Sequence, residues 1–308
     1  MVATNASPYP ALDDLLAASP VLLAALGGLR QAAPLDSPVL LLGEAGSGRS
    51  TLARALHRAS GRTGALVEVD PSTVPATLFE SELFGYRAGA FTGATADVEG
   101  RVARAERGTL VLDQVEEIPL AAQPKLLRLL AERRYRPLGG EERTAAVRFV
   151  ALGGESLPRR VRQGLFRSDL YYRLEVLAFR VPPLRERKGE VPALATTLLA
   201  DLAARLARPA PPLAQSAQAW MSEHVWPGNL RELRNVLERA LVLTDGGPLD
   251  PQPPAAFAGA RPRPLAEVER EEIVKALAHT RGHQGKAAAL LGISRKALWE
   301  KRKRFGIP

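Results

Sequence analysis

The chain contains no cysteine among its 308 residues. Disulfide bonds, thiolate zinc sites and cysteine catalysis are therefore excluded. It also lacks an apolar run of about eighteen residues, the length that a membrane-spanning helix needs. The amino terminus reads MVATNASPYP, without the basic segment and apolar core of a signal peptide. These absences predict a cytoplasmic protein with no membrane partner.

Basic residues are concentrated near the carboxyl terminus. The whole chain carries a net charge of +9, and residues 261–308 hold twelve Lys and Arg against five Asp and Glu, a net of +7. Such an excess in a short segment is typical of a domain that binds a polyanion such as nucleic acid. The alternative is a solvated basic tail without a partner.

Short apolar runs alternate with segments of helical spacing over the first 184 residues. Two of the helical segments are Thr51–Ala59 and Ala121–Arg133. Strands that alternate with helices favour a three-layer α/β domain around a largely parallel sheet. The runs expected to form its strands are Val39–Leu42, Ala65–Val69, Thr109–Leu112, Arg148–Leu152 and Val176–Val181.

The strand pattern stops after Leu184. The helical segments that follow predict a small helical subdomain, and they are Glu190–Leu206, Ser216–His224 and Leu230–Leu243. Residues 246–264 contain six prolines, a composition typical of a linker. A last helical unit runs from Leu265 to the end of the chain.

A glycine-rich loop follows the first predicted strand. Residues 43–50 read GEAGSGRS, which fits the P-loop pattern except that Arg49 stands in place of lysine. Glycines let successive N–H groups point into one concavity, and the next helix adds its positive end, so phosphates bind there. Ser50 supplies the hydroxyl expected on Mg²⁺. A plain tight turn between strand and helix is the alternative.

Another strand, within GTLVLDQ at residues 108–114, ends in the carboxylate of Asp113. This is the Walker B arrangement, in which the carboxylate would hold the magnesium shell, although such an Asp can also cap the next turn. Together the two segments predict a site for ATP and Mg²⁺, with Ser50 and Asp113 toward the metal. The residues assigned to the nucleotide are Gly43, Glu44, Ala45, Gly46, Ser47, Gly48, Arg49, Ser50 and Thr51.

The most specific signal is residues 80–94, ESELFGYRAGAFTGA. With it the chain resembles the sigma-54-dependent activators, or bacterial enhancer-binding proteins, from Ser19 to the end. The resemblance implies an AAA+ P-loop domain with a helical lid and assembly into a ring, a hexamer in that family, with itself or a paralogous subunit. It also implies contact with sigma-54 RNA polymerase through Gly89, Ala90, Phe91, Thr92, Gly93 and Ala94. On physics alone this stretch is a flexible surface turn.

Two further segments match that family. FRSDLYYRL at 166–174 resembles the segment with the arginine fingers, which implies that Arg167 and Arg173 act in a neighbouring subunit's site. Otherwise they are surface arginines that pair with Asp169. WPGNLREL at 226–233 resembles the sensor II segment and implies that Arg231 turns toward the phosphates. Otherwise it is an ordinary residue in the first turn of a helix.

The last unit resembles a Fis-type helix-turn-helix. Its first motif helix would be residues 285–291 and its second Arg295–Phe305, which Ser294 caps. The second helix is expected to lie in the major groove of an enhancer-like upstream site. Trp299 could stack there, but an aromatic residue at this spacing is more often part of the core. The residues assigned to DNA are Lys286, Ser294, Arg295, Lys296, Lys301 and Arg302.

Positions that serve the chain's own nucleotide depart from the family. Arg49 cannot place the compact charge of lysine between phosphates. Gln114 replaces the glutamate that polarises the attacking water, and loss of such a base typically costs about 10²–10⁴-fold in rate. Gly153 and Gly154 replace a polar Thr-Asn pair at sensor I, which leaves a polar contact missing. The residues assigned to catalysis are Asp113, Gln114, Arg167 and Arg173.

Asp70 stands where the family has an asparagine that bonds to the Walker B glutamate. An amide and a carboxylate can bond in either order. We therefore expect the Asp70 carboxylate and the Gln114 amide within about 2.7–3.2 Å of each other or across one water. The alternative is drift in a site released from selection for hydrolysis, with Asp70 only capping the turn at Pro71.

The expected organisation is a tail (1–18), an AAA+ α/β subdomain (19–184), a helical lid (185–245), a linker (246–264) and a Fis-type domain (265–308). The short leading segment predicts no sensor domain, so that control comes from a partner or from expression level. Three functions compete: an ATP-driven sigma-54 activator, a ring subunit with weak or absent hydrolysis beside a competent relative, and a DNA-binding repressor with a scaffold AAA+ part. The second is favoured.

Overall fold

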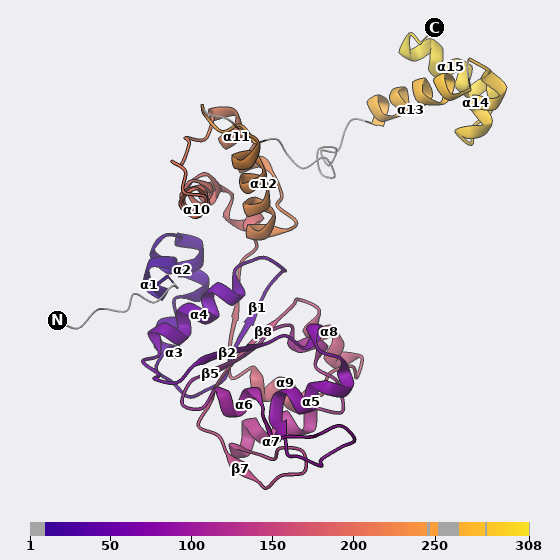
Figure 1. Ribbon diagram of the computed structural model, residues 1–308. Coiled ribbons are helices and arrows are strands. Elements are labelled where there is room, and N and C mark those ends of the chain that lie inside the picture. The colour runs from indigo at the N-terminus through magenta and orange to yellow at the C-terminus, as the bar shows by residue number, and fades with distance from the viewer. Residues whose placement is uncertain (1–9, 245–246, 252–264, 281, 308) are drawn as a thin grey trace. The chain divides into compact units, whose positions relative to one another are not determined.

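The computed structural model describes residues 10–244, 247–251, 265–280 and 282–307. The chain forms two compact units, divided between Gln252 and Pro253 (Figure 1). Within the described residues, no helix is long and apolar enough to cross a lipid bilayer.

A five-stranded sheet is the centre of the first unit. All its neighbouring strands are parallel, in the order β2-β5-β8-β1-β9. Each apolar run predicted as a strand forms one, so the predicted α/β class is confirmed. The strands are β1 (Val39–Leu42), β2 (Leu66–Val69), β5 (Thr109–Leu112), β8 (Arg148–Gly153) and β9 (Leu177–Arg180).

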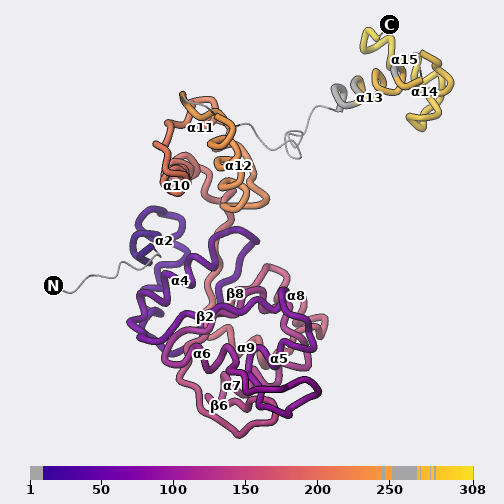
Figure 2. Tube along the Cα trace, in the orientation of Figure 1, coloured from indigo at the N-terminus to yellow at the C-terminus, as the bar shows by residue number. Residues whose placement is uncertain are grey.

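Alternate residues of the strands enter two separate cores, which makes the domain three-layered. Val39 and Leu41 of β1 pack with the amino-terminal helices, whereas Leu40 packs on the opposite face. Figure 2 follows the chain from the first group of helices to the second. The first face carries α1 (Leu12–Ala17), α2 (Pro20–Leu26), α3 (Leu29–Ala32) and α4 (Arg49–Ala59). The second carries α5 (Ala76–Phe84), α6 (Arg101–Arg104), α7 (Gln123–Glu132), α8 (Leu157–Arg162) and α9 (Ser168–Leu174).

The amino-terminal boundary differs from the expected tail over residues 1–18. Leu12 and Leu16 of α1 are buried in the core of the first face, and α1 contacts α4. The side chain of Ser19 caps α2, where its Oγ accepts from Leu22 N at 3.0 Å. The domain therefore begins before Ser19, because two leucines one helical turn apart are already part of its core.

Two short hairpins project from the second face. They are β3 (Gly85–Tyr86) with β4 (Val98–Glu99), and β6 (Arg134–Tyr135) with β7 (Arg143–Thr144). The 3-10 turns η1 (Pro71–Thr73) and η2 (Val115–Glu117) follow β2 and β5. Strands of two residues leave no alternating pattern, so the sequence did not predict these hairpins.

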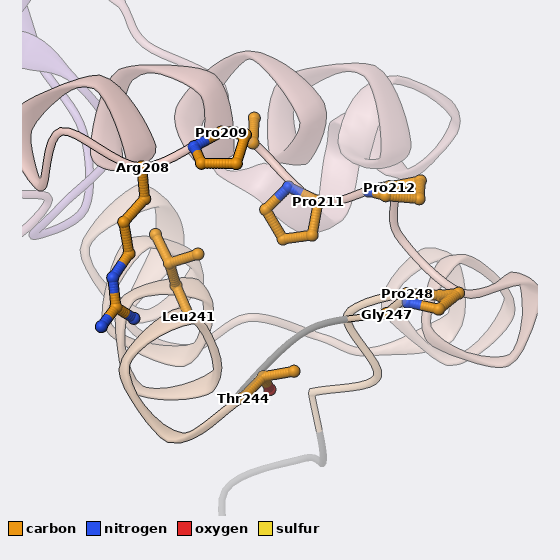
Figure 3. Close-up of a pocket in the computed structure, with 9 residues that line it drawn as sticks. Arg208, Pro209, Pro211, Pro212, Leu241, Thr244, Gly247 and Pro248 are labelled. Carbon is orange, nitrogen blue, oxygen red and sulfur yellow. The ribbon is translucent and has the colours of Figure 1, made fainter.

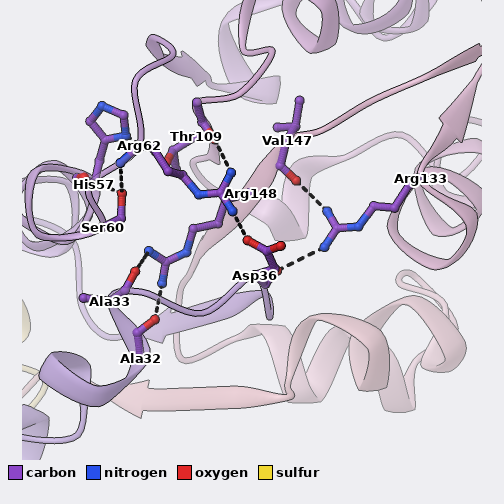
Figure 4. A network of polar contacts seen from close by, with 11 residues as sticks. Ala32, Ala33, Asp36, His57, Ser60, Arg62, Thr109, Arg133, Val147 and Arg148 are labelled. Carbon is purple, nitrogen blue, oxygen red and sulfur yellow. Dashed lines mark hydrogen bonds and ion pairs between the residues drawn. The ribbon is translucent and has the colours of Figure 1, made fainter.

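The amino-terminal end of the sheet is fixed by the buried guanidinium of Arg148 (Figure 4). Its Nη1 donates to Ala33 O at 2.6 Å and its Nη2 to Ala32 O at 2.7 Å, at the end of α3. Burial lowers the pKa of Arg148 to about 10. Beside it Asp36 pairs with Arg62, and Arg133 donates to the carbonyl of Asp36 at 3.0 Å. This network lies at the opposite end of β8 from the glycine-rich loop.

The lid is a helical subdomain after the sheet. Its elements are η3 (Leu184–Glu190), α10 (Val191–Arg205), α11 (Gln215–Glu223) and α12 (Asn229–Leu243). Leu249 is buried in its core and pairs with Leu213 in a β-bridge. Residues 247–251 therefore belong to the lid rather than to the predicted linker, whose other residues, 246 and 252–264, lie outside the described residues. The prolines of this segment indicated a linker, so the sequence did not predict that Leu249 is part of the lid core.

A groove of about 540 Å³ lies at the carboxyl-terminal end of α12 (Figure 3). Leu241 and Thr244 line it from the helix side, opposite the proline-rich loop at 208–212. A helix of 15 residues spans roughly 22 Å, so the groove is far from Asn229 at the other end of α12.

The second unit contains α13 (Leu265–His279), α14 (Gln284–Leu290) and α15 (Arg295–Phe305). Its small core includes Ile273, Ala287 and Leu298. The Ser294 Oγ accepts from Ala297 N at 3.1 Å, so the predicted cap of α15 is confirmed. Gly292 in the turn has a φ of +65°, a conformation that glycine adopts without strain.

Candidate nucleotide site and partner surfaces

The glycine-rich loop needs its glycines for conformation and for space. Gly46 and Gly48 have φ values of +74° and +102°. A Cβ on Gly46 would lie 2.4 Å from the carbonyl oxygen of Gly228 in the lid. Immediately after Gly48 the eleven-residue helix α4 begins at Arg49. The loop therefore leads directly into the amino-terminal end of a helix, where backbone N–H groups can bind phosphate.

Two buried polar atoms of this loop have no hydrogen-bond partner among the described residues. They are Ser47 Oγ and Arg49 Nη1. Buried donors without partners are rare because leaving them unpaired costs free energy. Phosphate oxygens would satisfy both atoms, so the residues present fit a nucleotide.

Ser50 and Asp113 come together as the sequence predicts. Ser50 Oγ lies 3.4 Å from Asp113 Oδ2, and Asp113 follows β5 at the carboxyl edge of the sheet. No group of three or more His, Asp or Glu suited to a metal occurs within the described residues. A Mg²⁺ ion here would take its remaining ligands from phosphates and water, as is usual for this ion in proteins.

The predicted contact between Asp70 and Gln114 is confirmed. Gln114 Nε2 donates to Asp70 Oδ2 at 2.8 Å and to Ser72 Oγ at 2.9 Å. The other carboxylate oxygen, Asp70 Oδ1, accepts from Ser72 N at 2.9 Å and caps η1. Asp70 therefore caps the turn and holds the amide at once. Ser72 had not been singled out from the sequence.

A carboxylate lies beside the sensor I glycines. Gly154 N donates to Glu116 Oε1 at 2.8 Å, and Glu116 is only 9% exposed. Sequence reasoning missed Glu116, because a glutamate three residues after Asp113 reads as part of a solvated turn. η2 therefore places a carboxylate beside the sensor I position, where the sequence had indicated no polar side chain.

The lid is joined to the glycine-rich loop through Asn229, which is fully buried. Its Oδ1 accepts from Leu184 N at 2.7 Å, and its Nδ2 donates to Ala45 O and to Glu44 Oε2, both at 3.1 Å. A hydrogen bond from Arg185 lowers the pKa of Glu44. The sequence had suggested Asn229 only as part of a turn, and a buried amide cannot be recognised without its partners.

Arg231 lies beside the loop and is exposed. A Cβ on Gly46 would be 3.1 Å from Arg231 Cβ. The backbone of the first turn of α12 also contacts the loop, since Leu230 N donates to Gly46 O at 3.0 Å. The predicted sensor II residue is thus adjacent to the predicted phosphate loop.

The two arginines expected to act in trans make local contacts. Arg167 is 46% exposed and pairs through two hydrogen bonds, of 3.0 and 2.7 Å, with Asp169. This pairing lowers the pKa of Asp169. Arg173 is exposed and donates to Leu130 O at 3.4 Å. Within the described chain neither guanidinium bonds to the glycine-rich loop.

The GAFTGA segment closes on itself at the end of the β3–β4 hairpin. Gly89 N donates to Ala94 O at 2.8 Å, and Ala88 N donates to Asp97 Oδ1 at 2.9 Å. This backbone hydrogen bond, with Arg87, lowers the pKa of Asp97. The Phe91 ring is 41% exposed and lies 4.9 Å from the Tyr86 ring. The segment therefore displays one aromatic ring between Gly89 and Gly93, whose φ values are +81° and +99°.

The exposed face of α15 carries Arg295, Lys296, Trp299 and Lys303. Trp299 is 56% exposed, with the Lys303 ammonium 5.4 Å above its ring. The expectation that Trp299 belongs to the core was wrong, because Leu298 fills that position instead. Lys286 is exposed on α14, whereas Lys301 pairs with Glu269 and Arg302 is half-buried.

Comparisons with known proteins match almost the whole chain. Residues 15–180 match the sigma-54 interaction domain, residues 185–258 the AAA+ ATPase lid domain, and residues 264–305 the bacterial regulatory proteins of the Fis family.

Relatives and solved structures agree with these matches. The alginate biosynthesis transcriptional regulatory protein AlgB of Pseudomonas aeruginosa is 40% identical, over 96% of this chain and 68% of that protein. The response regulator protein PilR of the same species is 37% identical, over 98% and 72%. NtrX from Brucella abortus, crystallised in complex with ATP, superposes with a TM-score of 0.70 at 28% identity, over 100% of this chain and 69% of that one. The chain therefore belongs to the sigma-54-dependent transcriptional activators, with an AAA+ domain, its lid and a Fis-type DNA-binding helix-turn-helix.

Proposed function

We propose that this regulator binds ATP in an AAA+ ring, contacts sigma-54 through the GAFTGA loop and hydrolyses ATP weakly or not at all by itself. The observation that carries the proposal is the hydrogen bond from Gln114 Nε2 to Asp70 Oδ2 at 2.8 Å. The amide at the Walker B position is a donor to its neighbours and carries no charge to polarise a water.

Nucleotide would be held by the loop from Gly43 to Thr51. Ser47 and Arg49 each offer a buried polar group to phosphate oxygens. Ser50 and Asp113 would hold Mg²⁺, which supplies neutralisation of phosphate charge when it is bound. NtrX was crystallised with ADP and with ATP, and its likeness to this chain supports nucleotide binding here.

Partner contacts would use three separate surfaces. The exposed Phe91 between two glycine hinges suits a contact with sigma-54 that changes with the loop's conformation. Arg167 and Arg173 are exposed and would act in a neighbouring subunit's site, in a hexamer of this chain or of this chain with a paralogue. The basic face of α15 would bind an enhancer-like upstream site in the major groove.

ATP hydrolysis by the full-length protein tests the proposal. It is measured alone, then with a co-expressed competent relative, and then with sigma-54 and DNA. Turnover below about 1% of the relative's, together with ATP binding, is expected from loss of a general base. A rate equal to the relative's would overturn the weak-hydrolysis part.

A fully competent activator is the second candidate. The intact GAFTGA segment and the exposed Arg167 and Arg173 favour it, since these groups would also serve a ring in which every subunit hydrolyses ATP. Strong stimulation of turnover by sigma-54 or DNA would select this candidate. A protein that binds DNA and fails to bind sigma-54 would instead be a repressor with a scaffold AAA+ domain.

A further inference from the structure

Glu116 occupies the space of a side chain at position 154. A Cβ on Gly154 would lie only 2.5 Å from Glu116 Oε1. The carboxylate is fixed there by Gly154 N at 2.8 Å, and Arg160 Nη1 holds the carbonyl of Glu116 at 2.9 Å. A side chain at position 154 would therefore displace the carboxylate of Glu116, so the two positions are coupled.

The second carboxylate oxygen of Glu116 has no hydrogen-bond partner among the described residues. This oxygen, Oε2, is also buried. A buried carboxylate oxygen without a donor costs free energy. Such an atom is suited to accept a hydrogen bond from a donor outside the chain, such as a water molecule.

The position of this oxygen follows from the sheet. β8 lies between β5 and β1, so the residue after β8 lies between Asp113 and the glycine-rich loop at the same carboxyl edge. Gly43 N donates to Gly153 O at 3.1 Å, which ties the loop directly to this strand end. Ser50 and Asp113, whose side chains lie 3.4 Å apart, are the residues that would hold Mg²⁺ beside the phosphates at this edge.

We propose that Glu116 is the side chain by which this chain distinguishes a nucleoside triphosphate from a diphosphate, through contact with the terminal phosphate. Its Oε1 stays on Gly154, and its Oε2 accepts a hydrogen bond from a water that also donates to an oxygen of that phosphate. The negative charge also sets a lower affinity for a triphosphate than a neutral side chain would. This inference rests on the proposed ATP site.

Nucleotide affinity tests the role without relying on turnover. Kd is measured on the full chain with Mg²⁺ for ADP and for the imido analogue of ATP. Glu116→Gln should tighten the analogue about tenfold relative to ADP, the order expected for removing one charge near another at an effective dielectric well above 4. The matched control is Glu117→Gln, whose carboxylate is 40% exposed and pairs with Arg160 at 2.5 Å. It should leave the ratio unchanged.

A second variant protects the test against misfolding. Gly154→Ala should push the carboxylate away and shift the ratio in the same direction, and adding Glu116→Gln should then change it little. Thermal unfolding of each variant verifies folding. If both nucleotides bind and neither Glu116→Gln nor Gly154→Ala moves the ratio, this inference is wrong while the proposed site stands. If neither nucleotide binds the native chain, the proposed function fails first.

Discussion

Asp70 and Gln114 carry the carboxylate and the amide in the reverse order to the family's pair, and the two side chains are still hydrogen-bonded. Each oxygen of Asp70 has a separate task, one on Ser72 N and the other on the Gln114 amide. The bond keeps the local structure of β2 and β5, whereas the charge that should face the water has moved one strand away.

Restoring the family's order at this pair should restore turnover. Gln114→Glu alone sets two carboxylates about 2.8 Å apart, which raises the pKa of one of them and weakens the local fold. Gln114→Glu with Asp70→Asn should raise ATP hydrolysis about tenfold or more above either single variant, within the range of a general base. Steady-state phosphate release provides the measurement. A double variant no faster than the single ones would place the deeper lesion at Arg49 or Gly154.

Arg148 contributes stability rather than chemistry. Arg148→Ala should lower the free energy of unfolding by about 2–4 kcal/mol, because two buried helix-end carbonyls lose their donors. Arg30→Ala is the matched control, since Arg30 is 43% exposed and pairs with an exposed Asp13. Its loss should cost about 0–1 kcal/mol. Urea unfolding compares the two, and equal midpoints would contradict the assigned role.

Helix α15, the second helix of the helix-turn-helix, combines charge with one exposed aromatic ring. Arg295, Lys296 and Lys303 share its exposed face with Trp299. Charged residues contact phosphates of any sequence, whereas an apolar ring can contact the methyl group of thymine. The two kinds of residue should therefore differ in how their loss affects DNA binding.

Two substitutions on α15 test this difference with a DNA site selected from a random library. Lys303→Ala should reduce the slope of log affinity against log salt by about 0.9, the effect of one phosphate contact. Trp299→Ala should weaken the selected site about tenfold, leave nonspecific binding and the slope unchanged, and become silent when uracil replaces thymine. Equal loss on all DNA would assign Trp299 to folding.

A truncation after residue 260 should abolish DNA binding. Retained affinity would contradict the assignment of DNA binding to this unit.

Assembly decides whether the exposed arginines have a function. Arg173→Ala should depress the turnover of a competent relative in mixed rings, by up to ~10³–10⁵-fold if it acts as a finger. Arg162→Ala, at another exposed arginine, should have no such effect. Light scattering at high concentration with nucleotide should detect a hexamer. Monomers alone under these conditions would contradict the ring.

Local patterns were sufficient for the strands of the five-stranded sheet, the helices of the lid and the motifs. The apolar runs, the glycine-rich loop and the capped α15 depend on residues close in the chain, and all were predicted at nearly their observed bounds. The Asp70–Gln114 contact was also predicted, because the family has a bonded amide–carboxylate pair at these two positions and such a pair can bond in either order.

Contacts between segments far apart in the sequence could not be predicted from local patterns. Glu116 fills the space above Gly154, Asn229 joins the lid to the loop, and Leu249 returns to the lid core. Trp299 remains on the surface because Leu298 fills the core. In each case the role depends on which partner occupies the neighbouring volume, and only packing in three dimensions decides that.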